Sequence, residues 1–178
     1  SAIDPIQHLA QSPPFEGLQT TGLEAVLRFS QRRRVERAAF FYHQGDPATA
    51  FYLLTEGEAK LTQVTPEGHQ MLVRFAGPGE CFGSIAALKD AVYTLSVQAV
   101  QDCVALAWDG ESLARIMDRY PRVALSVLDL VAGHYKRLLD RYQELVTERV
   151  ERRVARSLLR LARQAGQKVE SGVLIGLP

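Results

Sequence analysis

Short apolar runs separated by turn residues fill residues 51–79, whose sequence is FYLLTEGEAKLTQVTPEGHQMLVRFAGPG. The turns fall at Glu56-Gly57, Pro66-Glu67-Gly68 and Gly77-Pro78-Gly79, and each run between them has the length of a strand. Strands at this spacing, joined by turns rich in Gly and Pro, are typical of an all-β sandwich or a jelly-roll barrel.

The strand pattern continues on both sides of this stretch. Phe40-Phe41-Tyr42 precedes it, and residues 96–99 and 104–108 follow it as further apolar runs. Residues 32–120 are therefore predicted to form a mainly β domain, a double-stranded β-helix of the jelly-roll, cupin-like type. Residues 1–31 predict short helices that flank it.

Residues 109–147 change to helical periodicity. Asp109 is predicted to cap a short helix that ends near Tyr120, and Pro121 opens a long helix over residues 121–147. Apolar residues along the long helix recur at spacings of 3 and 4, which predicts a coiled-coil seam between two copies of the chain. Packing of this seam against its own domain is the alternative. The seam consists of Leu128, Val131, Tyr135, Leu138, Tyr142 and Leu145.

Residues 148–178 carry a second amphipathic pattern. An apolar stripe is backed by a face of arginines, Gly166 stops the helix, and residues 173–177 form a strand-like run. One helix and one strand cannot close a core, so we expect the chain to end inside a small domain of a longer natural protein. The arginine face is either solvated or contacts DNA phosphates, with Arg152, Arg153 and Arg156 as the candidates.

The composition narrows the class of protein. The 21 Lys+Arg residues and 20 Asp+Glu residues give a net charge of +1, which excludes a strongly basic nucleic-acid arm. Cys81 and Cys103 are predicted to be buried free thiols.

The chain has neither an apolar run of membrane-spanning length nor a signal peptide, so we expect it to work in the cytoplasm, away from the membrane. No catalytic constellation is visible, and a cupin-type metalloenzyme would need a His-x-His pair that the sequence lacks.

The order of these segments resembles the CRP/FNR family of transcription regulators over essentially the whole chain. The resemblance implies an effector-sensing β-roll, a dimerisation helix, and a truncated start of a winged helix-turn-helix DNA-binding domain at residues 148–178. It implies a homodimer, DNA, a small-molecule effector and RNA polymerase as partners. The alternatives are a haem-dependent nitric-oxide or redox-gas sensor of the same family, and a cyclic-nucleotide-binding regulatory module without DNA function. The motifs that carry the resemblance are Gly45-Asp46-Pro47, Glu56-Gly57, Thr65-Pro66-Glu67-Gly68, Gly77-Pro78-Gly79-Glu80-Cys81-Phe82-Gly83 and the segment 148–161.

The family's cyclic-nucleotide members use a Gly-Glu step and an Arg-Ser pair to hold the ribose and the phosphate. This chain has Ser84 at the Glu place, Tyr93 and Thr94 near the Arg-Ser place, and no arginine between Arg74 and Arg115. A buried cyclic phosphate would lack its cation, so the sequence disfavours cyclic AMP. The resemblance places the effector pocket at Gly83, Ser84, Ile85, Tyr93, Thr94, Leu138 and Leu139.

The identity of the effector stays open. An iron–sulfur cluster of the FNR kind needs four Cys ligands, and the chain has two. Two leucines at the expected pocket, Leu138 and Leu139, suggest an apolar ligand, a haem, or a pocket filled by protein. His43, His69 and His134 are the candidate haem ligands, and for each a surface or hydrogen-bonded histidine is the alternative.

Overall fold

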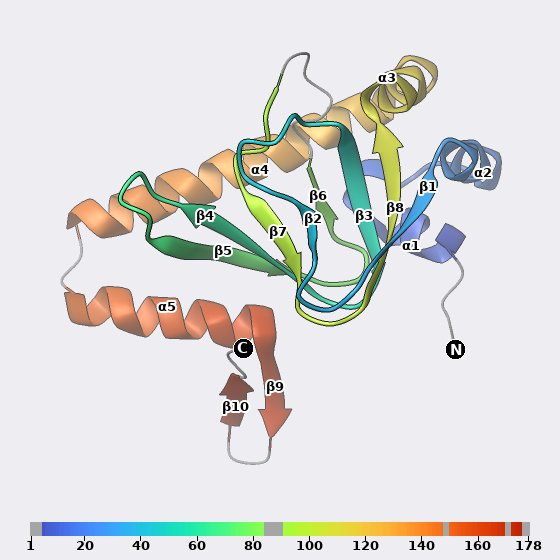
Figure 1. Cartoon of the computed structure of the whole chain (residues 1–178). Coiled ribbons are helices and arrows are strands. Elements are labelled where there is room, and N and C mark those ends of the chain that lie inside the picture. Colours follow the sequence, from blue (N-terminus) through green and yellow to red (C-terminus); the bar gives the residue numbers. More distant parts are fainter. Residues whose placement is uncertain (1–4, 84–90, 148–149, 170–171, 176–178) are drawn as a thin grey trace. The chain divides into compact units, whose positions relative to one another are not determined.

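The structure is a computed structural model that describes residues 5–83, 91–147, 150–169 and 172–175 (Figure 1). The chain divides into two compact units, Ser1–Leu130 and Val131–Pro178. The border between them falls within the long helix α4 (Pro121–Thr147). Among the described residues, every helix is too short or too polar to cross a bilayer.

The described residues of the first unit form two antiparallel sheets of four strands each, which confirms the predicted jelly-roll class. The first sheet has the order β1 (Gln31–Val35), β8 (Cys103–Asp109), β3 (Ala50–Glu56), β6 (Cys81–Phe82). The second sheet has the order β2 (Phe40–Tyr42), β7 (Ser96–Ala99), β4 (Ala59–Val64), β5 (Gln70–Ala76).

The helices of the first unit precede and follow the strands, as the sequence predicted. Asp109 caps α3 by accepting a hydrogen bond from the Ser112 backbone N–H at 2.7 Å, which confirms the predicted cap. The helices are α1 (Pro5–Gln11), the short 3-10 helix η1 (Pro13–Phe15), α2 (Thr20–Arg28), α3 (Gly110–Arg119) and the start of α4.

The second unit continues α4 and adds α5 (Val150–Ala165) and a small hairpin. Gly166 ends the helix, as predicted, but it also begins the strand β9 (Gly166–Val169). The strand expected at residues 173–177 is β10 (Gly172–Ile175), which pairs antiparallel with β9. The strand β9 was not predicted because its sequence, GQKV, has a single apolar residue with a large side chain and no alternation.

The central strands β3 and β8 bury side chains on both faces of the first sheet, because successive side chains of a strand point to opposite sides. In β3, Tyr52 and Leu54 face the interior between the two sheets. Phe51 and Leu53 face a second core. The helices of the first unit supply the other wall of that second core, where the Trp108 indole N–H donates to the Val26 carbonyl at 2.8 Å.

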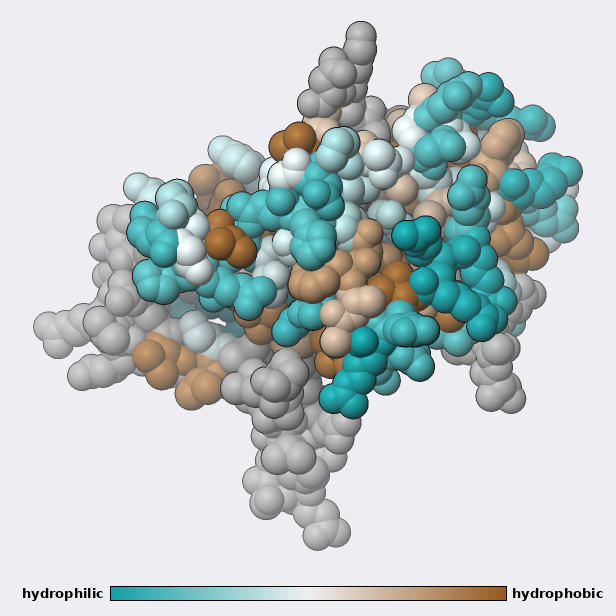
Figure 2. Space-filling model, viewed as in Figure 1, coloured by the Kyte–Doolittle hydropathy of each residue, from teal (hydrophilic) through white to brown (hydrophobic). Residues whose placement is uncertain are grey.

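The surface of the first unit is mostly hydrophilic on the face that Figure 2 draws, and its hydrophobic residues form small separate spots. The strand β1 contributes Arg32, Arg33 and Arg34, all exposed. Arg32 forms an ion pair with Glu56 at 3.5 Å across this surface.

Candidate effector site

Gly83 and Tyr93, two residues of the predicted pocket, lie together at the start of β3. Gly83 has a φ of 76°, in the left-handed region. A Cβ atom at this position would lie 2.7 Å from the Ala50 carbonyl oxygen and 3.4 Å from the Tyr93 ring. Both the backbone conformation and the close approach therefore require glycine here.

The Tyr93 hydroxyl is bound to the backbone of β3 and of the residue before it. It accepts hydrogen bonds from the Ala50 N–H at 2.8 Å and the Thr49 N–H at 3.2 Å. It donates to the Ala50 carbonyl at 2.7 Å. Tyr93 itself is buried. A phenol whose hydroxyl is committed to the protein backbone thus lies near the place where the resemblance puts a phosphate-binding arginine.

Aromatic side chains surround Tyr93 inside the β-roll. Tyr42 stacks on Tyr93 with ring centroids 3.5 Å apart and an interplanar angle of 11°. Tyr52 stacks on Phe82 at 5.2 Å and 16°. Phe41 makes a T-shaped contact with each ring of that second pair. We call these residues the inner aromatic cluster: Phe41, Tyr42, Tyr52, Phe82 and Tyr93.

Burial keeps two phenols of this cluster, Tyr42 and Tyr52, neutral. It raises the pKa of Tyr42 well above its ordinary value, with further contributions from Tyr93 and Tyr52. Burial also raises the pKa of Tyr52 to about 12. The nearby Arg74 guanidinium partly opposes the shift in the pKa of Tyr42. At neutral pH these two hydroxyls therefore offer hydrogen bonds but no negative charge.

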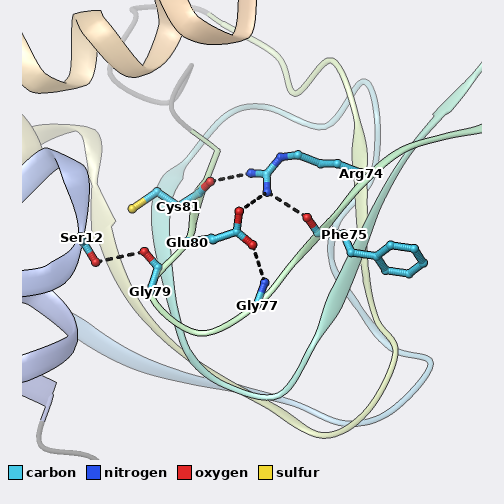
Figure 3. A network of polar contacts seen from close by, with 7 residues as sticks. All are labelled: Ser12, Arg74, Phe75, Gly77, Gly79, Glu80 and Cys81. Atoms are coloured by element: carbon cyan, nitrogen blue, oxygen red, sulfur yellow. Dashed lines mark hydrogen bonds and ion pairs between the residues drawn. The ribbon is translucent and has the colours of Figure 1, made fainter. Parts of the chain in front are cut away.

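Arg74 on β5 forms a polar network that joins β5 to β6 (Figure 3). Its guanidinium donates to the Cys81 carbonyl at 2.8 Å and to the Phe75 carbonyl at 3.0 Å. It also pairs with the Glu80 carboxylate at 3.4 Å. The Arg74 side chain is 15% exposed and that of Glu80 is 55% exposed, so the cation is the more deeply placed partner.

The remaining predicted pocket residues lie elsewhere or outside the described residues. Thr94 is exposed. Ser84 and Ile85 fall outside the described residues. Leu138 and Leu139 are exposed on α4 in the second unit, and their part in the pocket stays a prediction.

The three candidate haem ligands lie on different elements. His43 is exposed in the turn after β2, with its ring 4.2 Å from that of Phe40. His69 is exposed just before β5, and His134 is half-buried on α4. Haem ligation by these residues stays a prediction. Cys81 and Cys103 are buried free thiols, as predicted, and burial raises the pKa of both.

The predicted dimer seam forms a stripe of exposed apolar side chains along α4. The exposed fractions are 62% for Leu128, 44% for Val131, 62% for Tyr135, 63% for Leu138 and 66% for Tyr142. The side chain of Leu145 is outside the described part of the helix. Among the candidate DNA contacts, Arg156 is exposed on α5, and the side chains of Arg152 and Arg153 lie outside the described residues.

Comparison with known proteins identifies a matching family and a similar regulator. Residues 32–120 match the family described as cyclic nucleotide-binding domain. The chain is 31% identical over 153 residues to the cyclic AMP receptor protein of Thermus thermophilus, a match that covers 86% of this chain and 71% of the relative.

Solved structures agree with these matches. The catabolite activator protein of Thermus thermophilus superposes with a TM-score of 0.73 at 31% identity, covering 86% of this chain and 72% of that one. The sensor domain of the transcriptional regulator DNR from Pseudomonas aeruginosa gives a TM-score of 0.64 at 25% identity, covering 75% of this chain and 90% of that one.

Proposed function

The chain belongs to the CRP/FNR family of transcription regulators, and from this premise we propose how its parts act as the effector-sensing and dimerising portion of such a regulator. The β-roll binds a small signal molecule, and two copies associate through α4. The signal shifts the population between two arrangements of the dimer, and with it the DNA-binding heads. In this scheme the β-roll is a binding module and carries out no catalysis.

The exposed apolar stripe on α4 is the main observation that supports the proposed dimer. Leucine, valine and tyrosine side chains repeat on one face of the helix, and each described member is at least 44% exposed in the single chain. A contiguous apolar stripe of this kind is costly in water and marks an interaction site. Its 3 and 4 spacing fits a second identical helix, as in a two-stranded coiled coil.

The proposed effector is not a cyclic nucleotide held by an arginine at the family's usual place. The Thermus relative is named as a cyclic AMP receptor. In this chain Tyr93 stands at that place, and its hydroxyl is occupied by Ala50 and Thr49. A buried phosphate there would meet no cation from this side chain, and an uncompensated buried charge is strongly disfavoured.

The arginines of α5 supply a non-specific part of DNA binding in this proposal. Arg152, Arg153 and Arg156 would contact phosphates and position the head, and sequence would be read by other residues of the regulator. As part of the same role in transcription regulation, we propose that the regulator contacts RNA polymerase and acts in the cytoplasm.

Sedimentation equilibrium of the 178-residue chain tests the dimer. The double variant Leu128→Gln/Leu138→Gln should weaken association by about a hundredfold, because each change is present twice in a symmetric interface. Lys136→Gln introduces the same side chain outside the seam and should leave association unchanged. A chain that is monomeric at all concentrations, or a double variant that dimerises like the parent, would refute the proposal.

A further inference from the structure

We propose that the outer edge of β1 binds an extended acidic segment of another protein, which joins the first sheet as an additional strand. The segment carries three consecutive carboxylates, one beside each of Arg32, Arg33 and Arg34. This surface for a protein partner goes beyond the proposed effector site and the proposed dimer, and it depends on neither.

The strand β1 lies at the end of the first sheet and has a side without a strand (Figure 1). Among the described residues, β8 is the only strand that pairs with β1. At such an edge, alternate residues direct their backbone N–H and carbonyl groups away from the sheet, where another strand can pair with them. Gln31 and the three arginines are all exposed, so a partner can reach this edge along most of its length.

The positive charge of β1 is only partly balanced within the chain. Arg32 pairs with Glu56 at 3.5 Å, but about half of each side chain is exposed, so a carboxylate of a partner can compete for the guanidinium. Arg33 and Arg34 form no ion pair with any described residue. The exposed Glu36 follows the strand, so an acidic run longer than three residues would meet a like charge there. A guanidinium also presents a planar fork that matches a carboxylate.

The three arginines point to both faces of the sheet. Val35 belongs to the core between the two sheets, so Arg33, two residues earlier, points to that side. Arg32 lies opposite Leu106, which belongs to the helix-covered core, and Arg34 shares the side of Arg32. A strand beside β1 alternates in the same way, so three consecutive acidic residues each meet an arginine on its own face.

This alternation favours a peptide over two other occupants. A DNA backbone approaches from one side, where it meets Arg32 and Arg34 on one face or Arg33 on the other. A second copy of β1, paired antiparallel over its full length, places Arg33 opposite Arg33 and Arg32 opposite Arg34. Like charges directly opposite each other destabilise a strand pair. An extended acidic segment satisfies both the charges and the free backbone groups of the edge.

Fluorescence anisotropy with the labelled peptide Thr-Val-Glu-Glu-Glu-Val-Thr and the 178-residue chain tests the site. This acidic peptide should bind saturably, and the matched peptide with Gln in place of each Glu should not. The isomer Glu-Thr-Glu-Val-Glu-Val-Thr has the same composition but carries its carboxylates on one face of a strand. It should bind about threefold more weakly, because it loses a cross-strand charge pair.

Two versions of the acidic peptide, each N-methylated at a different set of alternate residues, test the backbone pairing. At least one of them should bind more than about tenfold more weakly, because the N–H groups that face β1 are then blocked. If both bind like the unmethylated peptide, charge alone holds the peptide and strand addition is refuted.

Substitutions on β1 locate the site. Arg33→Gln and Arg34→Gln should each weaken binding about threefold, and the triple change at Arg32, Arg33 and Arg34 by more than about tenfold. All three positions are exposed, so the variants should fold, which circular dichroism checks.

The control variant Arg115→Gln/Arg119→Gln/Arg122→Gln removes the same charge from exposed positions on α3 and α4 and should leave peptide binding unchanged. The proposal is overturned if the acidic peptide does not bind, if the Gln peptide binds equally well, or if both triple variants lose the same affinity. It is also overturned if the β1 variant loses affinity for a DNA duplex while the parent chain ignores the peptide, which would assign this edge to DNA.

Discussion

The two faces of the first sheet both bury large aromatic rings, but their polar content differs. The helix-covered face packs Trp108, Phe15 and Phe51 against aliphatic side chains, and the Trp108 N–H has a backbone partner. The face inside the β-roll holds phenols, with the Arg74 guanidinium nearby. An interior that retains so many hydrogen-bonding groups is suited to recognition, whereas the helix-covered face is suited to stability. We therefore expect substitutions on the two faces to have different consequences.

The largest effect is expected at the helix-covered face. Trp108→Ala should lower the free energy of unfolding by about 3–5 kcal/mol, because it opens a large cavity in a dry core and leaves the Val26 carbonyl without its donor. Urea unfolding measures the change. A loss below about 1.5 kcal/mol would contradict the stabilising role given to the helix-covered face.

A smaller effect is expected inside the β-roll at Tyr93. Tyr93→Phe keeps the ring and its stacking on Tyr42, but leaves the Ala50 N–H and carbonyl without their partner. The expected cost is about 1–3 kcal/mol by the same urea measurement. Thr94→Val, which removes an exposed hydroxyl at the neighbouring position, is the control and should change stability by less than about 0.5 kcal/mol. Equal effects for both variants would contradict the role given to the Tyr93 hydroxyl.

The cap of α3 should contribute less again, with a defined pH dependence. Asp109→Ala should cost about 1 kcal/mol at neutral pH, because the Ser112 N–H loses its acceptor. The hydrogen bonds from Ser112 lower the pKa of Asp109 in the folded protein. A depressed folded-state pKa means that the stabilisation is present above the unfolded-state pKa and is lost as the pH falls through the folded-state value.

Unfolding curves at a series of acidic pH values check this dependence. The difference in stability between the parent and Asp109→Asn should shrink as the pH falls, because the amide can cap the helix but does not titrate. A difference that grows on acidification would contradict the assignment.

The smallest effect is expected on the outer edge of the first sheet. Arg32 and Glu56 form an ion pair with about half of each side chain exposed, 56% and 50%. Arg32→Ala should change the free energy of unfolding by less than about 0.5 kcal/mol, since exposed pairs contribute little. A loss as large as that of Tyr93→Phe would show that the edge strand depends on this pair.

Most strands could be predicted from the sequence because their apolar runs end at Gly and Pro turns, as at Gly57 and Gly79. The strand β1 was missed because its sequence, QRRRV, shows no apolar alternation. It is a strand because it pairs with β8, Arg33 opposite Ala105, and that pairing partner lies far away in the sequence. Tertiary pairing overrides local preference in such cases.

Residues of the candidate site could be predicted only where they lie in or just after a contiguous sequence motif. Gly83 was expected from the turn motif that ends at it, and Tyr93 from its place after that motif. Tyr42, Tyr52 and Arg74 were missed, since they come from β2, β3 and β5 and converge only in the folded sheets. In the sequence, Arg74 stands out only as the border of a segment without arginines.

Isothermal titration of cyclic AMP into the 178-residue chain tests the replacement of the phosphate-binding arginine by Tyr93 most directly. We expect no saturable binding, because the Tyr93 hydroxyl is held by Ala50 and Thr49 and supplies no positive charge. Saturable binding of one cyclic AMP per chain would contradict it.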